Sequence, residues 1–136
     1  MAVIPRLYNE LAFLWPIISP PSEYIDEAAV FRDIVHEILG PGHHSLLELG
    51  VGGGHNLSHL TPDFDCVAVD LSPEMTALSE QLNPGIEHHV GDMRDIRLNR
   101  KFDSVLVHDA ASYLLSEQDL KNTFATAVIH LRPGGV

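Results

Sequence analysis

A glycine-rich loop that directly follows a short apolar run constrains this chain more than any other feature. The run Leu46–Leu49 is interrupted only by Glu48, and glycines then follow at every second position, at Gly50, Gly52 and Gly54. A buried strand that ends in such a loop lets bare backbone approach a ligand where a Cβ would collide, and the next helix can offer its N-terminal amides. This pattern predicts a nucleotide-like ligand at the end of a parallel strand.

The spacing of the glycines separates two classes of ligand. A dinucleotide fingerprint has the spacing G-x-G-x-x-G/A, but the residue three positions after Gly52 is His55. The acid-first pattern E-x-G-x-G-x-G, from Glu48 to Gly54, instead resembles the S-adenosylmethionine (SAM) loop of class I methyltransferases. The resemblance implies that Glu48, Gly50, Gly52 and Gly54 belong to a cofactor site.

A second acidic residue lies twenty residues after the first glycine of the loop. The run Cys66–Asp70 is typical of a second buried parallel strand that ends in a carboxylate. A carboxylate at this point can accept hydrogen bonds from both ribose hydroxyls, in nicotinamide enzymes as in SAM enzymes. Asp70 can also be a charge at a helix N-terminus, because Ser72 and Pro73 form an N-cap followed by proline at the first helical position.

A third motif follows a short predicted strand at 86–90. The resemblance implies that Asp92 takes the exocyclic amine of adenine, that the backbone amide of Met93 meets a ring nitrogen, and that Leu71 also contacts the cofactor. The alternative is that Asp92 is a solvated loop charge paired with Arg94, which contributes little at a surface.

The fourth motif places polar residues after an apolar strand at 102–107. In an open parallel α/β sheet, ligands lie outside the carboxyl ends of the strands, where the strand order reverses. We therefore expect His108, Asp109 and Tyr113 to face the methyl group, and Asp109 could instead hold the amino group of the cofactor. Histidine is the general base best suited to neutral pH; Asp109, Tyr113 and Tyr8 are the alternatives, and His108 could simply end the strand with a satisfied hydrogen bond.

Helix signals separate these motifs, which predicts an α/β fold built on an open parallel sheet. A helix begins after the N-cap Ser116 and ends before the turn at 132–135. The resemblance implies a Rossmann-like sheet with seven strands in the order 3-2-1-4-5-7-6. The chain reaches only the start of strand five, so we expect residues 43–136 to form a SAM-binding core truncated before that strand. Strand four would then expose an open apolar edge at 105–107, and we expect self-association there or a longer natural protein.

Residues 1–42 form an N-terminal segment ahead of the first strand. We expect a helix over 23–39, capped by Ser22 and ended by Gly40. Its predicted sheet-facing stripe consists of Ile25, Ala29, Val30, Ile34 and Ile38.

Aromatic residues gather before this helix, at Tyr8, Phe13 and Trp15, in a segment that Pro20 and Pro21 close. The segment is too short for a domain. The resemblance implies a lid over cofactor and substrate, from which Tyr8 could reach the acceptor; a plain N-terminal brace is the alternative.

Composition and charge exclude several kinds of partner. The net charge is −11 and only eight scattered Lys and Arg residues are present, which disfavours nucleic acid because phosphate contacts need clustered basic residues. No apolar run approaches the roughly 20 residues of a membrane helix. The single thiol, Cys66, lies in a predicted buried strand, so a disulfide framework is excluded and the reducing cytoplasm fits.

The nine histidines do not show metal-site spacing. His43 and His44 are adjacent, so in an extended chain their side chains point apart. His55 and His59 are four residues apart but lack the intervening glutamate of a zinc helix. We therefore expect no metal.

These observations favour a SAM-dependent methyltransferase that moves a methyl group to a nitrogen or oxygen atom of a small molecule and yields S-adenosylhomocysteine (SAH). The segment Gly91–Asp95 and Tyr8 resemble enzymes that methylate amino groups of nucleotide-linked sugars, whereas the D/N-P-P-Y segment of nucleic-acid amino-methylases is absent. A SAM-binding module without catalysis and, less favoured, a nicotinamide-dependent oxidoreductase are the alternatives.

Overall fold

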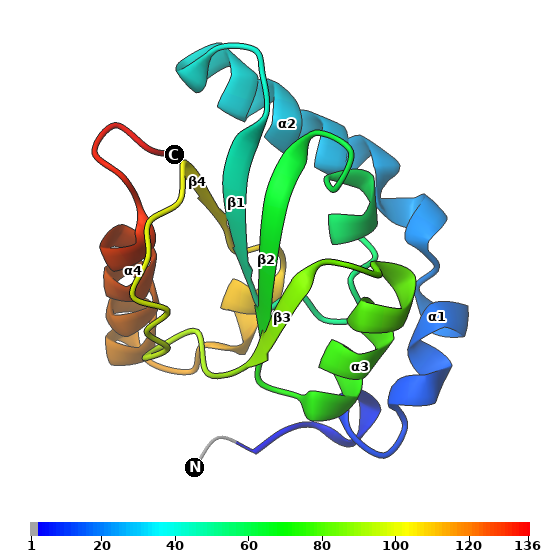
Figure 1. Cartoon of the computed structure of the whole chain (residues 1–136). Coiled ribbons are helices and arrows are strands. Elements are labelled where there is room, and N and C mark those ends of the chain that lie inside the picture. The colour runs from blue at the N-terminus through cyan, green and yellow to red at the C-terminus, as the bar shows by residue number, and fades with distance from the viewer. Residues whose placement is uncertain (1–2) are drawn as a thin grey trace.

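A four-stranded parallel sheet with the strand order β3-β2-β1-β4 forms the centre of the molecule (Figure 1). The computed structural model describes residues 3–136; residues 1 and 2 of the predicted N-terminal segment lie outside the described part. The strands are β1 (His44–Leu49), β2 (Phe64–Asp70), β3 (Glu87–Val90) and β4 (Ser104–Leu106). The order agrees with that of the first four strands of the class I methyltransferase sheet, so the predicted fold class is confirmed.

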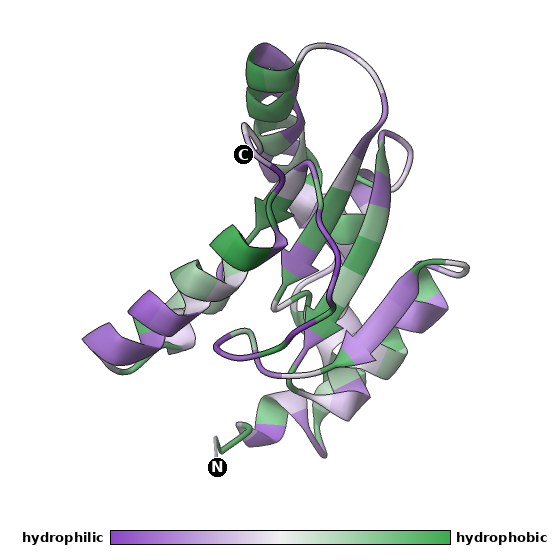
Figure 2. Ribbon diagram, turned by 60° about the vertical axis from the view of Figure 1, so that its left-hand side comes forward, coloured by the Kyte–Doolittle hydropathy of each residue, from purple (hydrophilic) through white to green (hydrophobic). Residues whose placement is uncertain are grey.

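The apolar content of β1 explains its central place. It pairs with β2 over six residues and with β4 over three. Leu46, Leu47 and Leu49 are all fully buried, as expected for a parallel strand covered on both faces. By contrast, the edge strand β3 is hydrophilic (Figure 2).

Helices cover both faces of the sheet. They are α1 (Trp15–Ile18), α2 (Ile25–Leu39), α3 (Pro73–Leu82) and α4 (Glu117–His130), and α4 lies on the opposite side from α2 and α3 (Figure 1). The predicted caps are present, because the Ser72 and Ser116 side chains accept hydrogen bonds from the Met75 and Asp119 amides. In the part of the chain from residue 3 onward, no helix combines the length and apolar character needed to cross a membrane.

Short 3₁₀ helices complete the connections. They are η1 (Arg6–Tyr8), η2 (Ala12–Leu14), η3 (Pro21–Tyr24), η4 (Leu57–His59) and η5 (Ala110–Tyr113).

The predicted start of α2 at residue 23 is wrong by two residues, because the helix begins at Ile25. Pro21 begins a 3₁₀ turn that runs directly into the helix, so Ser22 lies inside that turn and Tyr24 takes the N-cap position without a side-chain cap bond.

The predicted sheet-facing stripe of α2 is also wrong. Val30, Ile34 and Ile38 are 59%, 44% and 59% exposed, and Ile25 is exposed as well. The helix does pack on the sheet, but through another face, with Ala28, Phe31, Val35 and Leu39 in the cluster that contains Leu46 and Phe64. The helix carries apolar residues on two faces, and tertiary packing selects the one with the small Ala28.

The edge of β4 is not open along its whole length, in contrast to the expectation. The chain after α4 turns back beside this strand, where Leu131 bridges in parallel to Phe102. The Val105 amide donates to the Val136 carbonyl at 2.9 Å, and the Val136 amide donates to the Asp103 carbonyl at 3.1 Å. The segment 131–136 therefore covers the beginning of that edge.

Candidate functional site

A cavity of about 1020 Å³ lies at the carboxyl ends of β1, β2 and β4. Its lining combines the glycine loop after β1, the residues that follow β2 and β3, the turn after β4, and several residues of the N-terminal segment. All predicted site residues except Gly54 line it: Tyr8, Glu48, Gly50, Gly52, Asp70, Leu71, Asp92, Met93, His108, Asp109 and Tyr113.

Positive φ angles shape the glycine loop. Gly50, Gly52 and Gly54 have φ values of +79°, +58° and +77°, a region that residues with a Cβ rarely adopt. A Cβ on Gly52 would meet only Met75 Cε, at 3.5 Å, and both residues line the cavity. Protein packing thus leaves free the space in front of Gly52, as a backbone cradle requires.

Gly54 has a different environment from the one predicted. A Cβ there would collide with Ser79 Oγ and would lie 2.5 Å from Asn83 Nδ2, both on the neighbouring α3 side. The Asn83 side chain also donates from Nδ2 to the Gly54 carbonyl at 3.0 Å. This glycine lets the loop pack closely against α3, and it lies outside the cavity lining.

Asp70 connects the end of β2 to two backbone segments. Its Oδ2 accepts a hydrogen bond from the Gly52 amide at 2.8 Å, and its Oδ1 accepts one from the Ser72 amide at 2.9 Å. Burial raises the pKa of Asp70, although these backbone hydrogen bonds act in the opposite direction. Each carboxylate oxygen retains a further acceptor position, so Asp70 can bind a hydroxyl while holding the loop.

Glu48 brings a second buried carboxyl group to the same wall. It is 1% exposed, and among the described residues its Oε2 has no hydrogen-bond partner. Burial, together with the nearby Asp70 charge, raises the pKa of Glu48 to about 8, and a hydrogen bond from Asn56 opposes the shift. An unpaired buried polar atom beside a cavity is the kind of group that a polar ligand satisfies.

Asp92 and Met93 line the cavity after β3. Arg94 binds the Asp92 carboxylate through Nε and Nη2, at 3.0 Å and 2.6 Å, and reaches Asp119 through Nη1 at 3.0 Å. The hydrogen bonds from the Arg94 side chain lower the pKa of Asp92. The pairing with Arg94 considered as an alternative is therefore present, and it fixes the Asp92 carboxylate at the cavity wall in its charged form.

Trp15 covers the glycine loop from the N-terminal side. A Cβ on Gly53 would lie 2.7 Å from Trp15 Cδ1, and the indole stacks on the His55 ring with centroids 6.3 Å apart. His55 Nδ1 also bonds the Ser19 carbonyl, and His59 Nε2 bonds the Pro21 carbonyl at 2.7 Å. Two histidines that sequence reasoning considered only as metal ligands thus attach the N-terminal segment to the core.

Tyr8 and Tyr113 meet across the cavity. Their hydroxyl groups are hydrogen-bonded, and their rings pack edge to face with centroids 5.5 Å apart. Desolvation, followed by the Tyr113 hydrogen bond, raises the pKa of Tyr8 well above its usual range. Tyr8 therefore stays protonated at neutral pH and can donate a hydrogen bond.

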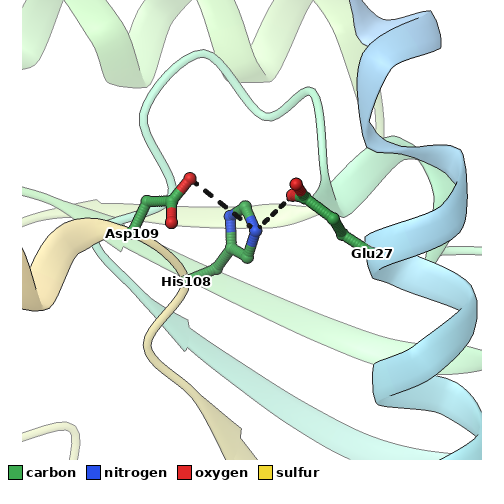
Figure 3. A group of neighbouring side chains, drawn as sticks. All are labelled: Glu27, His108 and Asp109. Carbon is green, nitrogen blue, oxygen red and sulfur yellow. Dashed lines mark hydrogen bonds and ion pairs between the residues drawn. The ribbon is translucent and has the colours of Figure 1, made fainter.

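His108 lies between two acidic side chains (Figure 3). Its Nε2 is 2.6 Å from Glu27 Oε2 and 3.9 Å from Asp109 Oδ2. Sequence reasoning missed Glu27, because nothing local connects a residue on the first turn of α2 with one 81 positions later. Glu27, His108 and Asp109 each place one atom of a kind that can bind a metal ion within 4.8 Å of the other two. The spacing of the histidines in the sequence could not reveal this group.

Comparison with known proteins places this arrangement in a family. A family model described as a methyltransferase domain matches residues 46–135. The dTDP-3-amino-3,4,6-trideoxy-alpha-D-glucopyranose N,N-dimethyltransferase of Streptomyces venezuelae is 36% identical over 84% of this chain and 48% of its own length. The dTDP-3-amino-3,6-dideoxy-alpha-D-glucopyranose N,N-dimethyltransferase of Streptomyces fradiae is 30% identical over 87% of this chain and 54% of its own length.

Solved structures show the same similarity. Streptomyces venezuelae DesVI superposes with a TM-score of 0.83 and 30% identity, over 92% of this chain and 54% of that one. The sugar N-methyltransferase KedS8 from Streptoalloteichus has a TM-score of 0.81 and 28% identity, over 99% of this chain and 53% of that one. The chain thus spans about half the length of the curated relatives it matches. Since the family match includes residues of all four strands and the whole glycine loop, the chain belongs to the methyltransferase-domain family, with the Rossmann-like fold of its class I members.

Proposed function

We propose that this chain binds SAM in the cavity and that the full protein transfers its methyl group to a nitrogen atom of a small molecule. The proposal rests on the hydrogen bond from the Gly52 amide to the Asp70 carboxylate. This bond places a carboxylate that can bind ribose hydroxyls next to a glycine at which an added Cβ would meet only Met75. The relative CalS10, an amino pentose methyltransferase of Micromonospora echinaspora solved with SAM bound, has a TM-score of 0.75 and supports this choice of cofactor.

The lining residues fit the parts of such a cofactor. Asp70 and Leu71 would hold the ribose, while Asp92 and the Met93 amide would hold the adenine. Glu48, whose Oε2 has no partner among the described residues, would receive the charged amino-acid end together with Gly50 and Gly52. Gly54 is not included, because its close contacts are with α3.

When bound, SAM supplies a methyl group on a sulfonium, whose thioether is already a good leaving group. The protein chiefly has to align the nucleophile with that methyl group and exclude water. We assign the covering role to Trp15 and Tyr8, which line the cavity from the N-terminal segment, so residues 1–42 act as a cap on the core at 43–136. His108 is the proposed base, and Asp109 and Tyr113, which line the same cavity, are the other candidates.

An amino sugar is the proposed acceptor, because the curated relatives from both Streptomyces species are dimethyltransferases of dTDP-linked amino sugars. A sugar amine is protonated at neutral pH, and this ammonium must lose a proton to become a nucleophile; His108 can accept that proton. Tyr8 is a poor base here because its raised pKa keeps the phenol protonated. We place the protein in the reducing cytoplasm, which suits the free, buried Cys66; self-association through β4 stays a prediction.

Methyl transfer tests the proposal directly. The full-length protein is incubated with SAM and a dTDP-linked 3-amino sugar, and mass spectrometry follows both SAH and the sugar. We expect SAH to form in step with sugars carrying one and then two added methyl groups. Binding of SAH without transfer to any amine would instead indicate a binding module, and displacement of SAM by NADH in a thermal-shift titration would indicate a nicotinamide enzyme.

A further inference from the structure

The contact between Glu27 and His108 joins the N-terminal segment to the catalytic end of the sheet. Glu27 belongs to the first turn of α2, and His108 follows β4. Their Oε2 and Nε2 atoms are 2.6 Å apart, and His108 lines the cavity with a side chain only 20% exposed. Figure 3 shows the imidazole between Glu27 and Asp109.

This contact determines which ring nitrogen can accept a proton. An ionised carboxylate offers only acceptor positions, so the nitrogen that faces Glu27 must carry the hydrogen. In a neutral imidazole the other nitrogen, Nδ1, then holds the free lone pair. Asp109 Oδ2, at 3.9 Å from Nε2, is too distant for a hydrogen bond and does not compete with Glu27.

Acidic and aromatic side chains surround the His108 ring. Glu27 faces it from α2 and Asp109 faces it from the turn after β4, and both are acidic. From η3, the Tyr24 ring packs edge to face against the imidazole with centroids 5.8 Å apart, which restricts rotation of the ring.

We propose that Glu27 is a positioning residue for the methyl transfer: it holds His108 as the Nε2–H tautomer and leaves Nδ1 as the base. This inference rests on the proposed function. The acceptor ammonium gives its proton to Nδ1 and keeps the N–H electron pair. That pair forms the new N–C bond while the methyl–sulfur bond breaks and its electrons leave on sulfur, so the products are a methylated ammonium, a protonated His108 and SAH.

The tautomer can be read without any ligand or activity. Long-range ¹H–¹⁵N NMR of histidine side chains distinguishes protonated from unprotonated ring nitrogens, and comparison with His108→Gln identifies the His108 signals. We expect an unprotonated Nδ1 in the wild type. Glu27→Gln should keep this tautomer, because the amide oxygen still accepts a hydrogen bond, whereas Glu27→Ala should mix the two tautomers.

Kinetics on the full-length protein supplies the second readout. With SAM and a dTDP-linked 3-amino sugar, Glu27→Ala should lower kcat by about 10²-fold, the lower range for loss of a general base, and leave the Kd of SAM unchanged. The matched control is Asp26→Ala, which removes the neighbouring first-turn carboxylate of α2 and should alter neither quantity.

Three results would overturn the inference while the proposed function stands. One is an Nδ1–H tautomer in the active wild type, and another is unchanged kcat in Glu27→Ala. The third is stoichiometric Zn²⁺ binding that removes the tautomer signal and is lost in Glu27→Ala, because His108 would then be a metal ligand. Absence of methyl transfer in the wild type overturns the function itself and the catalytic role with it, even with the Nε2–H tautomer present.

Discussion

Asp70 Oδ2 accepts a hydrogen bond from the Gly52 amide at 2.8 Å, so the carboxylate that ends β2 holds the loop that follows β1. The same side chain accepts the Ser72 amide at the start of α3. One buried acid therefore fixes two backbone segments around the cavity, and its removal should affect the fold as well as ligand binding.

Asp70→Ala should weaken SAH binding by about 1.5–3 kcal/mol, the usual loss for hydrogen bonds to a charged acceptor. It should also lower Tm, because the Gly52 and Ser72 amides lose their partner. Calorimetric titration and thermal unfolding measure the two effects. Asp65→Ala, on the same strand but with an exposed side chain, is the control; equal affinities in the two variants would show that Asp70 serves the loop alone.

Gly52→Ala and Gly54→Ala form a matched pair that separates ligand binding from packing. Both residues have positive φ, so each alanine should cost roughly 1–2 kcal/mol of backbone strain. Only the Cβ at Gly54 collides with α3, whereas the one at Gly52 extends beside Met75 at the cavity. Gly54→Ala should therefore have the lower Tm and Gly52→Ala the weaker SAH binding; the reverse order would contradict the assigned roles.

Trp15→Ala should loosen the N-terminal cap and leave the sheet intact. The indole packs on Gly53 and His55 while only partly buried, so we expect a loss of about 1–2 kcal/mol. Hydrogen exchange should accelerate over residues 5–24 and stay slow in β1, and SAH should bind more weakly. Phe13→Ala, at a side chain 66% exposed, is the control. Unchanged exchange in Trp15→Ala would refute the covering role.

Glu48 should make the ligand-free protein less stable as the pH rises from 4.5 to 8. Its pKa is raised from 4.5 to about 8 in the folded chain, so below pH 4.5 it is protonated in both states. Between these values only the unfolded chain releases the proton, which favours unfolding. Glu48→Gln lacks this proton release. The Tm of Glu48→Gln minus the Tm of the wild type should therefore increase as the pH rises across this range. A constant difference would show that Glu48 titrates normally.

Short-range patterns in the sequence were enough to predict the glycine loop, the acid that ends β2 and two helix caps. The glycine loop, the acid at the end of β2 and the caps at Ser72 and Ser116 each involve groups a few positions apart, or a strand followed by its own turn. These signals place the carboxyl ends of the strands at one edge, which explains why nearly all predicted site residues line one cavity.

Features set by tertiary packing could not be predicted in this way. The α2 helix has two apolar faces of similar periodicity, and only the sheet surface selects the one with Ala28 and Val35. The Glu27–His108 pair joins residues that share no local pattern. The role of Gly54 depends on how closely α3 approaches the loop, which glycine spacing does not encode.

A crystal structure of the full-length protein with SAH would show whether the cavity over the glycine loop is a SAM site. We expect SAH in this cavity, with its ribose hydroxyls bonded to Asp70 and its adenine beside Asp92 and Met93. SAH bound elsewhere, or in the cavity without contact to Asp70, would show that the cavity is not the proposed SAM site.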